Sequence, residues 1–440
     1  MNPDGLIVEH LPGAGVAEIV RPRFLPVIVV RNTVALYGVQ AGRKLIPLAS
    51  LPYLARVLGP RGWGELAFVT AMAELIVIVI EFGFTLSATR SIARYRDEPK
   101  GCGRVVAGVL AAQALLAGIA VTAAVVAARF IPLFRHRPSL LGAGLVYAIA
   151  QGFNPIWYFQ GLERLQLAAA LEIGAKTAAL GALFLFVHRP ADVWRALLIQ
   201  TLNPVVAILA GIVLMAQTSV VCRPDWTLVR EAVRDGWRMF TYRGAESLYG
   251  VGNSFLLGLY TGPVLVGLFS ASEKIGRATA GLVNPIRESL FPRISNLACR
   301  DGREACRLAR IGTHLMVGAG AVLSAALFFF AHVLILLLMG RSFEPAVTVL
   351  RILSPLPLLL SITFSSGQLW LIPHGRDKVV SRVVLCAAML NFGLSFWLGR
   401  QWAQNGMAAT VVISESAVAV SMLWSSFRHL DRGNACRAAA

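Results

Sequence analysis

Charged residues, and acidic ones above all, are scarce in this sequence. Asp, Glu, Lys and Arg make up only 15% of its 440 residues, with 23 acidic against 41 basic side chains. Soluble domains average about 25% charged residues. The chain also lacks a Walker-type phosphate loop, an HExxH zinc motif and a Gly-x-Ser-x-Gly nucleophile motif. We therefore expect no cofactor, no metal and no catalytic residues.

Long apolar runs take the place of the missing charge. Hydrophobic residues make up 56% of the chain, and its mean hydropathy is +0.66. Runs of about 20 apolar residues, enough to span a bilayer as a helix, recur along the whole length. The sequence predicts an all-α polytopic membrane protein with twelve spans, near residues 33–57, 64–87, 105–128, 139–160, 165–187, 194–217, 240–261, 264–288, 311–339, 345–371, 379–398 and 405–427.

The basic residues set the orientation of these spans. With the N-terminus inside, the cytoplasmic segments carry 26 Lys and Arg, and the opposite loops carry nine, of which Arg129, Arg135 and Arg137 form an unexpected outer cluster. Basic residues favour cytoplasmic loops, so both termini are predicted to be cytoplasmic. The net charge of +18 then reflects contact with anionic membrane lipids of a bacterial inner membrane. Nucleic acid is not an expected partner.

The longest break between spans divides the chain into two sets of six. The predicted segments are a cytoplasmic N-terminal segment (1–32), a six-helix half (33–217), a cytoplasmic linker with an interfacial helix (218–239), a second six-helix half (240–427) and a cytoplasmic tail (428–440). The halves also echo each other in two short patterns. Tyr-Gly-Val occurs at 37–39 and 249–251, and Gly-Pro-x-x-x-Gly occurs at 59–64 and 262–267. Two related halves suit a transporter that rocks one bundle against the other.

Five cations lie near the middle of three predicted spans, namely Arg43, Lys44, Lys176, Lys274 and Arg277. A charged residue at a lipid-facing helix centre costs about 2.5–3.5 kcal/mol on insertion scales, so these cations should face water or a carboxylate. Excess positive charge at one depth predicts a cavity for an anion.

The alternative for these cations is pairing with carboxylates in the spans, which are Glu74, Glu81, Glu172 and Glu273. Glu172 with Lys176, and Glu273 with Arg277, are four residues apart and can pair along one helix. Glu74 could pair with Arg43 across helices, and Glu74 and Glu81 could also take up protons. Arg43 and Lys44 are adjacent and point about 100° apart on a helix, so one carboxylate can hardly neutralise both.

Aromatic residues end the fourth predicted span at the cytoplasmic interface. Trp157 and Tyr158 are the candidates for stacking on sugars where a glycan enters. Anchoring at the membrane interface is the ordinary role of such residues and stays open as the alternative.

Several motifs in order resemble those of one transporter family. They are LPYLARVLGP at 51–60 with a following Gly64, EFGF at 81–84 with SATR at 87–90, PIWYFQGLE at 155–163, SASEK at 270–274 and LFPRIS at 290–295. They resemble the polysaccharide transporter family of O-antigen-type flippases, in the superfamily that also holds multidrug exporters. The doubled cation Arg43-Lys44 has no match in the family pattern, so its role rests on the physical argument alone.

The resemblance implies two six-helix lobes around a central cavity. It also implies a flippase that moves an undecaprenyl-pyrophosphate-linked oligosaccharide to the periplasmic leaflet, for O-antigen, exopolysaccharide or capsule assembly. A polysaccharide polymerase and chain-length proteins would be its neighbours. Two other functions stay open: a multidrug exporter of organic cations, which should have a net acidic cavity, and a membrane glycosyltransferase or polymerase. Short external loops count against the last.

Overall fold

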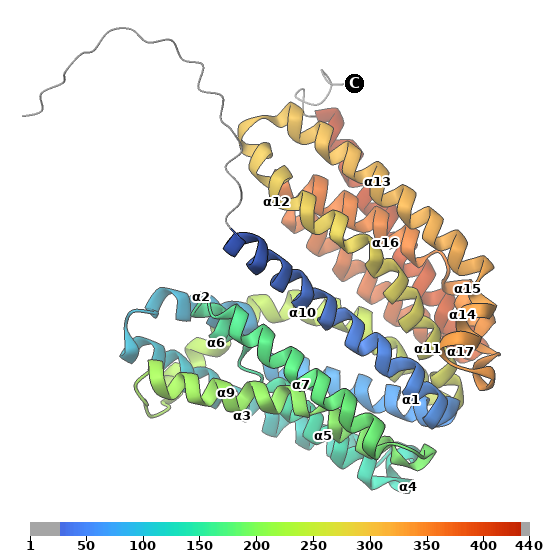
Figure 1. Cartoon of the computed structure of the whole chain (residues 1–440), viewed down its shortest axis with the longest axis horizontal. Helices are drawn as coiled ribbons and strands as arrows, with labels where there is room; N and C mark the ends of the chain where they lie inside the picture. The colour runs from blue at the N-terminus through green and yellow to red at the C-terminus, as the bar shows by residue number, and fades with distance from the viewer. Residues whose placement is uncertain (1–26, 433–440) are drawn as a thin grey trace, which may run out of the picture.

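The computed structural model describes the backbone of residues 27–432, and the side chains within it except those of residues 27–48, 238, 241–251, 299 and 429–432. Helices account for nearly all of the described backbone, and that part of the chain contains no strand. Figure 1 shows helices α2 to α9 gathered on one side of the molecule and α11 to α17 on the other.

The first helix, α1 (Val27–Glu81), contains two predicted spans. Instead of the expected loop at residues 58–63, the chain turns back at Gly59, whose φ of +64° favours glycine, and Pro60 starts the second part. The expected end of the second span is also different, because Phe82 and Gly83 have positive φ and a new helix begins there. The helices that follow are α2 (Phe84–Tyr95), α3 (Pro99–Ala128), α4 (Pro132–His136), α5 (Pro138–Gly152), α6 (Ile156–Gly161), α7 (Leu165–Phe186), α8 (Val193–Gln200) and α9 (Leu202–Thr218).

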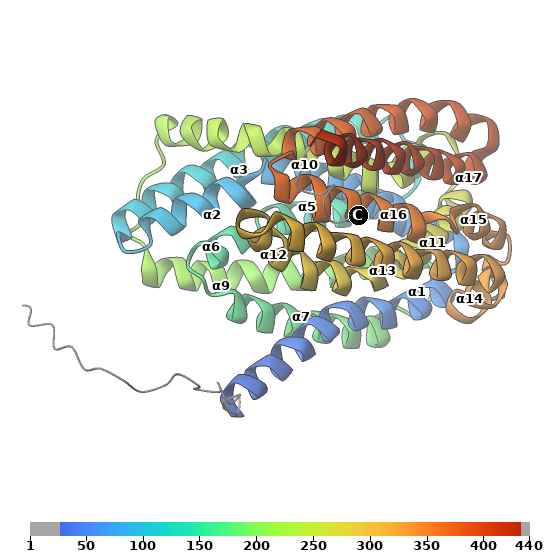
Figure 2. The ribbon, with the colours of Figure 1, turned by 90° about the horizontal axis from the view of Figure 1, so that it is seen from above.

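The predicted linker helix and the predicted seventh span form one helix, α10 (Trp226–Tyr260). Asp225 caps its start by accepting a hydrogen bond from the backbone N–H of Trp226. Val229 is buried against the first half, whereas Trp226 and Trp237 are exposed. The start of α10 is therefore packed on protein along one side. Figure 2 shows α10 between α3 and α17, both of which it contacts.

The remaining helices repeat this pattern of spans joined by short breaks. The tightest is in the last helix, which reverses at Trp402 and Ala403, where Ala403 has a φ of +47°. These helices are α11 (Pro263–Ala280), α12 (Asn284–Arg300), α13 (Gly302–Phe329), α14 (Ala331–Leu338), α15 (Ala346–Leu353), α16 (Leu356–Phe364), a π-helical turn (Ser365–Leu371) and α17 (Asp377–Arg432).

Seven helical stretches of the described chain are long and apolar enough to cross a membrane. Two of them, Ala49–Tyr95 with 47 residues and Asp377–Arg428 with 52 residues, are about twice the length that a bilayer needs. Each of these two contains one of the reversals described above. The chain is therefore a multi-pass helical membrane protein.

The two sides of the molecule meet at one end. Figure 1 shows α1 running to the end near the start of α11 and turning back there, while α2 and α12 lie far apart at the opposite end. The main core is continuous through this meeting point, because its buried residues come from α1, α5, α8, α11, α14 and α15.

Candidate functional site

One group of charged side chains lies on α11 and the second part of α17. The Nε atom of Arg277 lies 3.0 Å from Oε1 of Glu273, one turn earlier on α11. A terminal nitrogen of Arg277 lies 3.8 Å from Oε1 of Glu415 on α17. Both carboxylates are buried, with 10% and 2% of their side chains exposed. The predicted pair of Glu273 and Arg277 is confirmed, and Glu415 joins it as a residue that we had not assigned to the site.

Lys274 is next to this pair but in a different environment. Its side chain is exposed, whereas its neighbours Glu273 and Ile275 are buried. Helix α11 is in contact with α1, α10, α15, α16 and α17, so an exposed residue on it faces a space between helices. Among the described residues, no carboxylate lies within ion-pair distance of Lys274. Instead, its Nζ atom lies 4.6 Å from the centre of the Trp63 ring on α1, a cation–π contact.

A second charged group lies in the first half. Glu172 and Lys176, one turn apart on α7, form an ion pair of 2.7 Å, as their spacing predicts. They line a cavity of about 290 Å³ together with other polar residues of the first half, Glu81, Gln151, Asn154 and Asn203. This cavity is lined by charges of both signs rather than by cations alone.

Glu74 and Glu81 line a smaller cavity of about 190 Å³, and Glu81 and Gln151 are common to both cavities. Glu74 accepts a hydrogen bond of 2.9 Å from the hydroxyl of Tyr147 on α5. Tyr147 is a partner that the sequence analysis missed, because it is 73 residues away in the chain.

Two predicted binding residues cannot be placed by their side chains. Arg43 and Lys44 belong to the backbone of α1, but their side chains lie outside the described residues. The predicted gathering of five cations, and a pairing of Arg43 with Glu74, therefore stay predictions.

The two aromatic candidates are buried. Trp157 and Tyr158 of α6 are 1% and 0% exposed, in a cluster with helices α2, α3 and α9. The hydroxyl of Tyr158 forms a hydrogen bond of 2.6 Å with Oγ1 of Thr218. Neither ring is accessible to a sugar in this structure. The reason is that α6 is a six-residue helix folded inward after the break at Phe153 and Asn154.

The end at which the halves meet is built from the repeated Gly-Pro-x-x-x-Gly pattern. A Cβ atom added to Gly64 would lie 1.7 Å from the carbonyl oxygen of Pro263, and one added to Gly267 would lie 2.0 Å from that of Pro60. Each copy of the pattern thus presses its last glycine against the proline of the other. Only glycine allows backbones to approach this closely.

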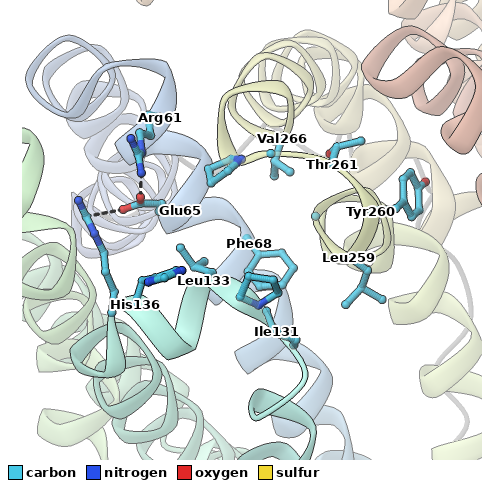
Figure 3. Close-up of a pocket in the computed structure, with 15 residues that line it drawn as sticks. Arg61, Glu65, Phe68, Ile131, Leu133, His136, Leu259, Tyr260, Thr261 and Val266 are labelled. Atoms are coloured by element: carbon cyan, nitrogen blue, oxygen red, sulfur yellow. Dashed lines mark hydrogen bonds and ion pairs between the residues drawn. The ribbon is translucent and has the colours of Figure 1, made fainter.

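A buried ion pair accounts for Arg137, one of the three arginines of the unexpected outer cluster. Figure 3 shows Glu65 of α1 beside Arg61. The Nη1 atom of Arg137 lies 2.7 Å from Oε2 of Glu65. Glu65 is 1% exposed, so it needs a cation beside it. These residues line a cavity of about 440 Å³ that also includes Tyr260, Thr261 and Val266 from the second half. Arg137 is therefore in this loop as a partner for Glu65.

Solved transporter structures share this fold, among them a multidrug transporter and a lipid II flippase. An inward-facing multidrug resistance transporter of the MATE family, in the MOP superfamily, matches 88% of this chain and 98% of its own, with a TM-score of 0.60 and 12% identity. The lipid II flippase MurJ, in an inward closed conformation, matches 90% of this chain and 87% of its own, with a TM-score of 0.63 and 10% identity. The chain is a multi-pass membrane protein with the fold of these transporters.

Sequence comparison narrows the class to a family. The model of the family described as "Polysaccharide biosynthesis protein" matches residues 29–298, and the chain belongs to that family. Two relatives are both named "Putative O-antigen transporter". The one from Escherichia coli (strain K12) is 29% identical over 89% of this chain and 95% of its own, and the one from Shigella dysenteriae is 26% identical over 89% and 98%.

Proposed function

We propose that this protein is a flippase for an undecaprenyl-pyrophosphate-linked oligosaccharide, and not an enzyme. The observation that carries the proposal is the likeness to an O-antigen transporter along 89% of the chain. The site adds a physical reason. A pyrophosphate with a polar glycan cannot enter the hydrocarbon core alone, and an exposed ammonium inside the helical bundle offers it a partner.

The proposed architecture has twelve spans in two six-helix lobes, residues 33–217 and 240–427, joined by residues 218–239. Short terminal segments, 1–32 and 428–440, lie in the cytoplasm, and the protein resides in the inner membrane. The arrangement in Figure 1 supports an inward-facing state. The lobes touch at the end that holds the predicted periplasmic loops and separate at the end that holds the basic, predicted cytoplasmic ones.

In this proposal the headgroup site is made of cations from both lobes. Lys274 and Arg277 of α11 would meet Arg43 and Lys44 of α1, and Lys176 would extend the site into the first lobe. Lys274 is the strongest member, because it is exposed and has no ion pair among the described residues. Glu74, Glu81, Glu172 and Glu273 would hold and orient the cations. Trp157 and Tyr158, being buried, are left out of the binding set.

Charge-changing variants test the site. Removing a hydrogen-bonded partner of a buried anion costs about 2–5 kcal/mol, enough to abolish binding. We expect Arg43→Ala, and Lys44→Ala with Lys274→Ala, to abolish complementation of a flippase-null strain while the protein still reaches the membrane. Arg43→Lys should keep partial function because it keeps the charge but loses the forked donors. Normal surface polysaccharide in the Arg43→Gln, Lys44→Gln double variant would refute the cationic site.

Export of organic cations is the second candidate, because the MATE transporter shares the fold and carboxylates line two cavities of the first half. The two functions give opposite results in one assay. A cation exporter would lower the drug sensitivity of the host cell and leave surface polysaccharide unchanged. A flippase would restore polysaccharide in the null strain and leave drug sensitivity unchanged.

If the protein is a flippase, we propose that a polysaccharide polymerase and chain-length proteins are its neighbours in the same membrane.

A further inference from the structure

The cation–π contact between Lys274 and Trp63 joins the two halves of the molecule. Trp63 belongs to the second part of α1 and directly precedes Gly64, where the halves meet. Lys274 lies on α11, two helical turns after Gly267, the other contact glycine. One partner is therefore part of the closed end, and the other faces the space inside the bundle.

Apart from the contact with Lys274, the Trp63 side chain has no polar partner among the described residues. Its side chain is 2% exposed, and its indole Nε1 atom is buried without a hydrogen-bond partner among the described residues. The ring is thus fixed by packing and by the ammonium of Lys274. A buried N–H without an acceptor costs free energy, so the indole gains nothing from hydrogen bonding in this position.

Between the residues whose side chains are described, few polar contacts cross from one half to the other at the closed end. The ion pairs of Glu65 with Arg61 and Arg137 lie within the first half and do not resist separation. One hydrogen bond does join the two halves: Arg56 donates to the carbonyl oxygen of Leu337 on α14, at a donor–acceptor distance of 2.5 Å. The glycine contacts add van der Waals attraction across the same end. The Lys274 contact is therefore one of the few polar contacts that add to the continuous apolar core at this end.

An anion in the bundle would compete for this ammonium. A pyrophosphate carries full negative charges and oxygen acceptors, whereas an aromatic ring offers only the negative face of its quadrupole. We propose that Lys274 acts as an occupancy sensor: a pyrophosphate group draws its ammonium away from Trp63 and thereby releases the outer gate at Gly64 and Gly267. This inference rests on the proposed function for the identity of the anion, and it adds the coupling between occupancy and opening.

Spin-label distances across the outer end test the coupling directly. Phe130 and Ser342 are exposed at the outer ends of different halves, and each can be replaced by a labelled cysteine in a chain whose native cysteines are serine. Inorganic pyrophosphate is the probe. We expect it to raise the long-distance population in the parent. Trp63→Leu should raise this population about threefold without the probe, as the loss of one cation–π contact allows, and the probe should add nothing further.

The same samples give the controls. Calorimetry should show that Trp63→Leu still binds pyrophosphate, because Lys274 is kept, whereas Lys274→Gln should weaken both binding and the distance response. Trp63→Phe keeps a ring face and should retain part of the response, so a folding defect in the leucine variant is recognised. Trp397→Leu, which removes an exposed tryptophan from α17, should behave like the parent.

The possible failures have different meanings. If pyrophosphate binds and changes the distances equally in the parent and in Trp63→Leu, the sensor is refuted and the proposed substrate stands. The sensor is also refuted, with the substrate unaffected, if Trp63→Leu has the parent distances without the probe. If pyrophosphate does not bind the parent, both the sensor and the proposed headgroup site are wrong.

Discussion

Most charged side chains described inside the bundle have an opposite charge or a hydrogen-bond donor beside them. Lys176 has Glu172, Arg277 has Glu273 and Glu415, and Glu74 has the hydroxyl of Tyr147. Lys274 instead has an aromatic ring. This contrast separates charges that are neutralised in the resting protein from Lys274, which we propose responds to an anion.

Arg277 offers a test of this division at the scale of single residues. Glu273→Gln removes its nearer carboxylate but leaves Glu415, so transport should fall by about two- to fivefold without a change in its dependence on external pH. Adding Glu415→Gln removes both partners, and the loss should exceed the product of the single losses. Transport is measured as surface polysaccharide in the complemented null strain over a range of pH. A loss of pH dependence in Glu273→Gln would identify Glu273 as a proton carrier instead.

At the scale of elements, the sequence predicted interactions within one helix and missed those between distant helices. The pairs Glu172–Lys176 and Glu273–Arg277 follow from a spacing of four on one helix, and both are present. Glu65–Arg137 and Trp63–Lys274 join distant helices, and no periodicity in one sequence determines which helices will be neighbours. The burial of Trp157 was missed for the same reason, since it depends on how the short helix α6 folds inward.

The repeated Gly-Pro-x-x-x-Gly pattern was visible in the sequence, but its meaning required the contact between α1 and α11. Gly64→Ala and Gly267→Ala should each prevent the outer end from closing, because the added Cβ would meet a backbone carbonyl. Gly262→Ala is the matched control in the same pattern, since nothing lies within 4 Å of its added Cβ.

The readout is a cysteine at Ser270, which is buried one turn below Gly267. A membrane-impermeant thiol reagent applied outside intact cells should label it about tenfold faster in the two gate variants, equivalent to a shift of about 1.4 kcal/mol in the closing equilibrium. Equal labelling in all three variants would mean that the glycine contact does not control closure.

At the scale of the whole molecule, the orientation in the membrane is a prediction from loop charge alone. In a cysteine-free background, cysteines that replace Phe130 and Arg230, both exposed, report on opposite ends of the bundle. Impermeant reagent should label only the cysteine at position 130 in intact cells, and both after the membrane is permeabilised. Labelling at position 230 in intact cells would show that the orientation is opposite to the predicted one. The proposed inward-facing state would then be outward-facing.

The continuous helix α10 has a consequence for dividing the chain into two fragments. The break before it, residues 219–225, is the natural place for a cut, but α10 begins beyond that break and still packs on the first half. Gly108 of α3 lies against the backbone of Leu228, and Gly236 of α10 lies against that of Phe82. A fragment that starts at α10 would thus carry a docking arm of several turns for the fragment that precedes it. We expect two separately expressed fragments to associate through this arm. The helix that connects the halves would thus also provide the binding surface for their reassembly.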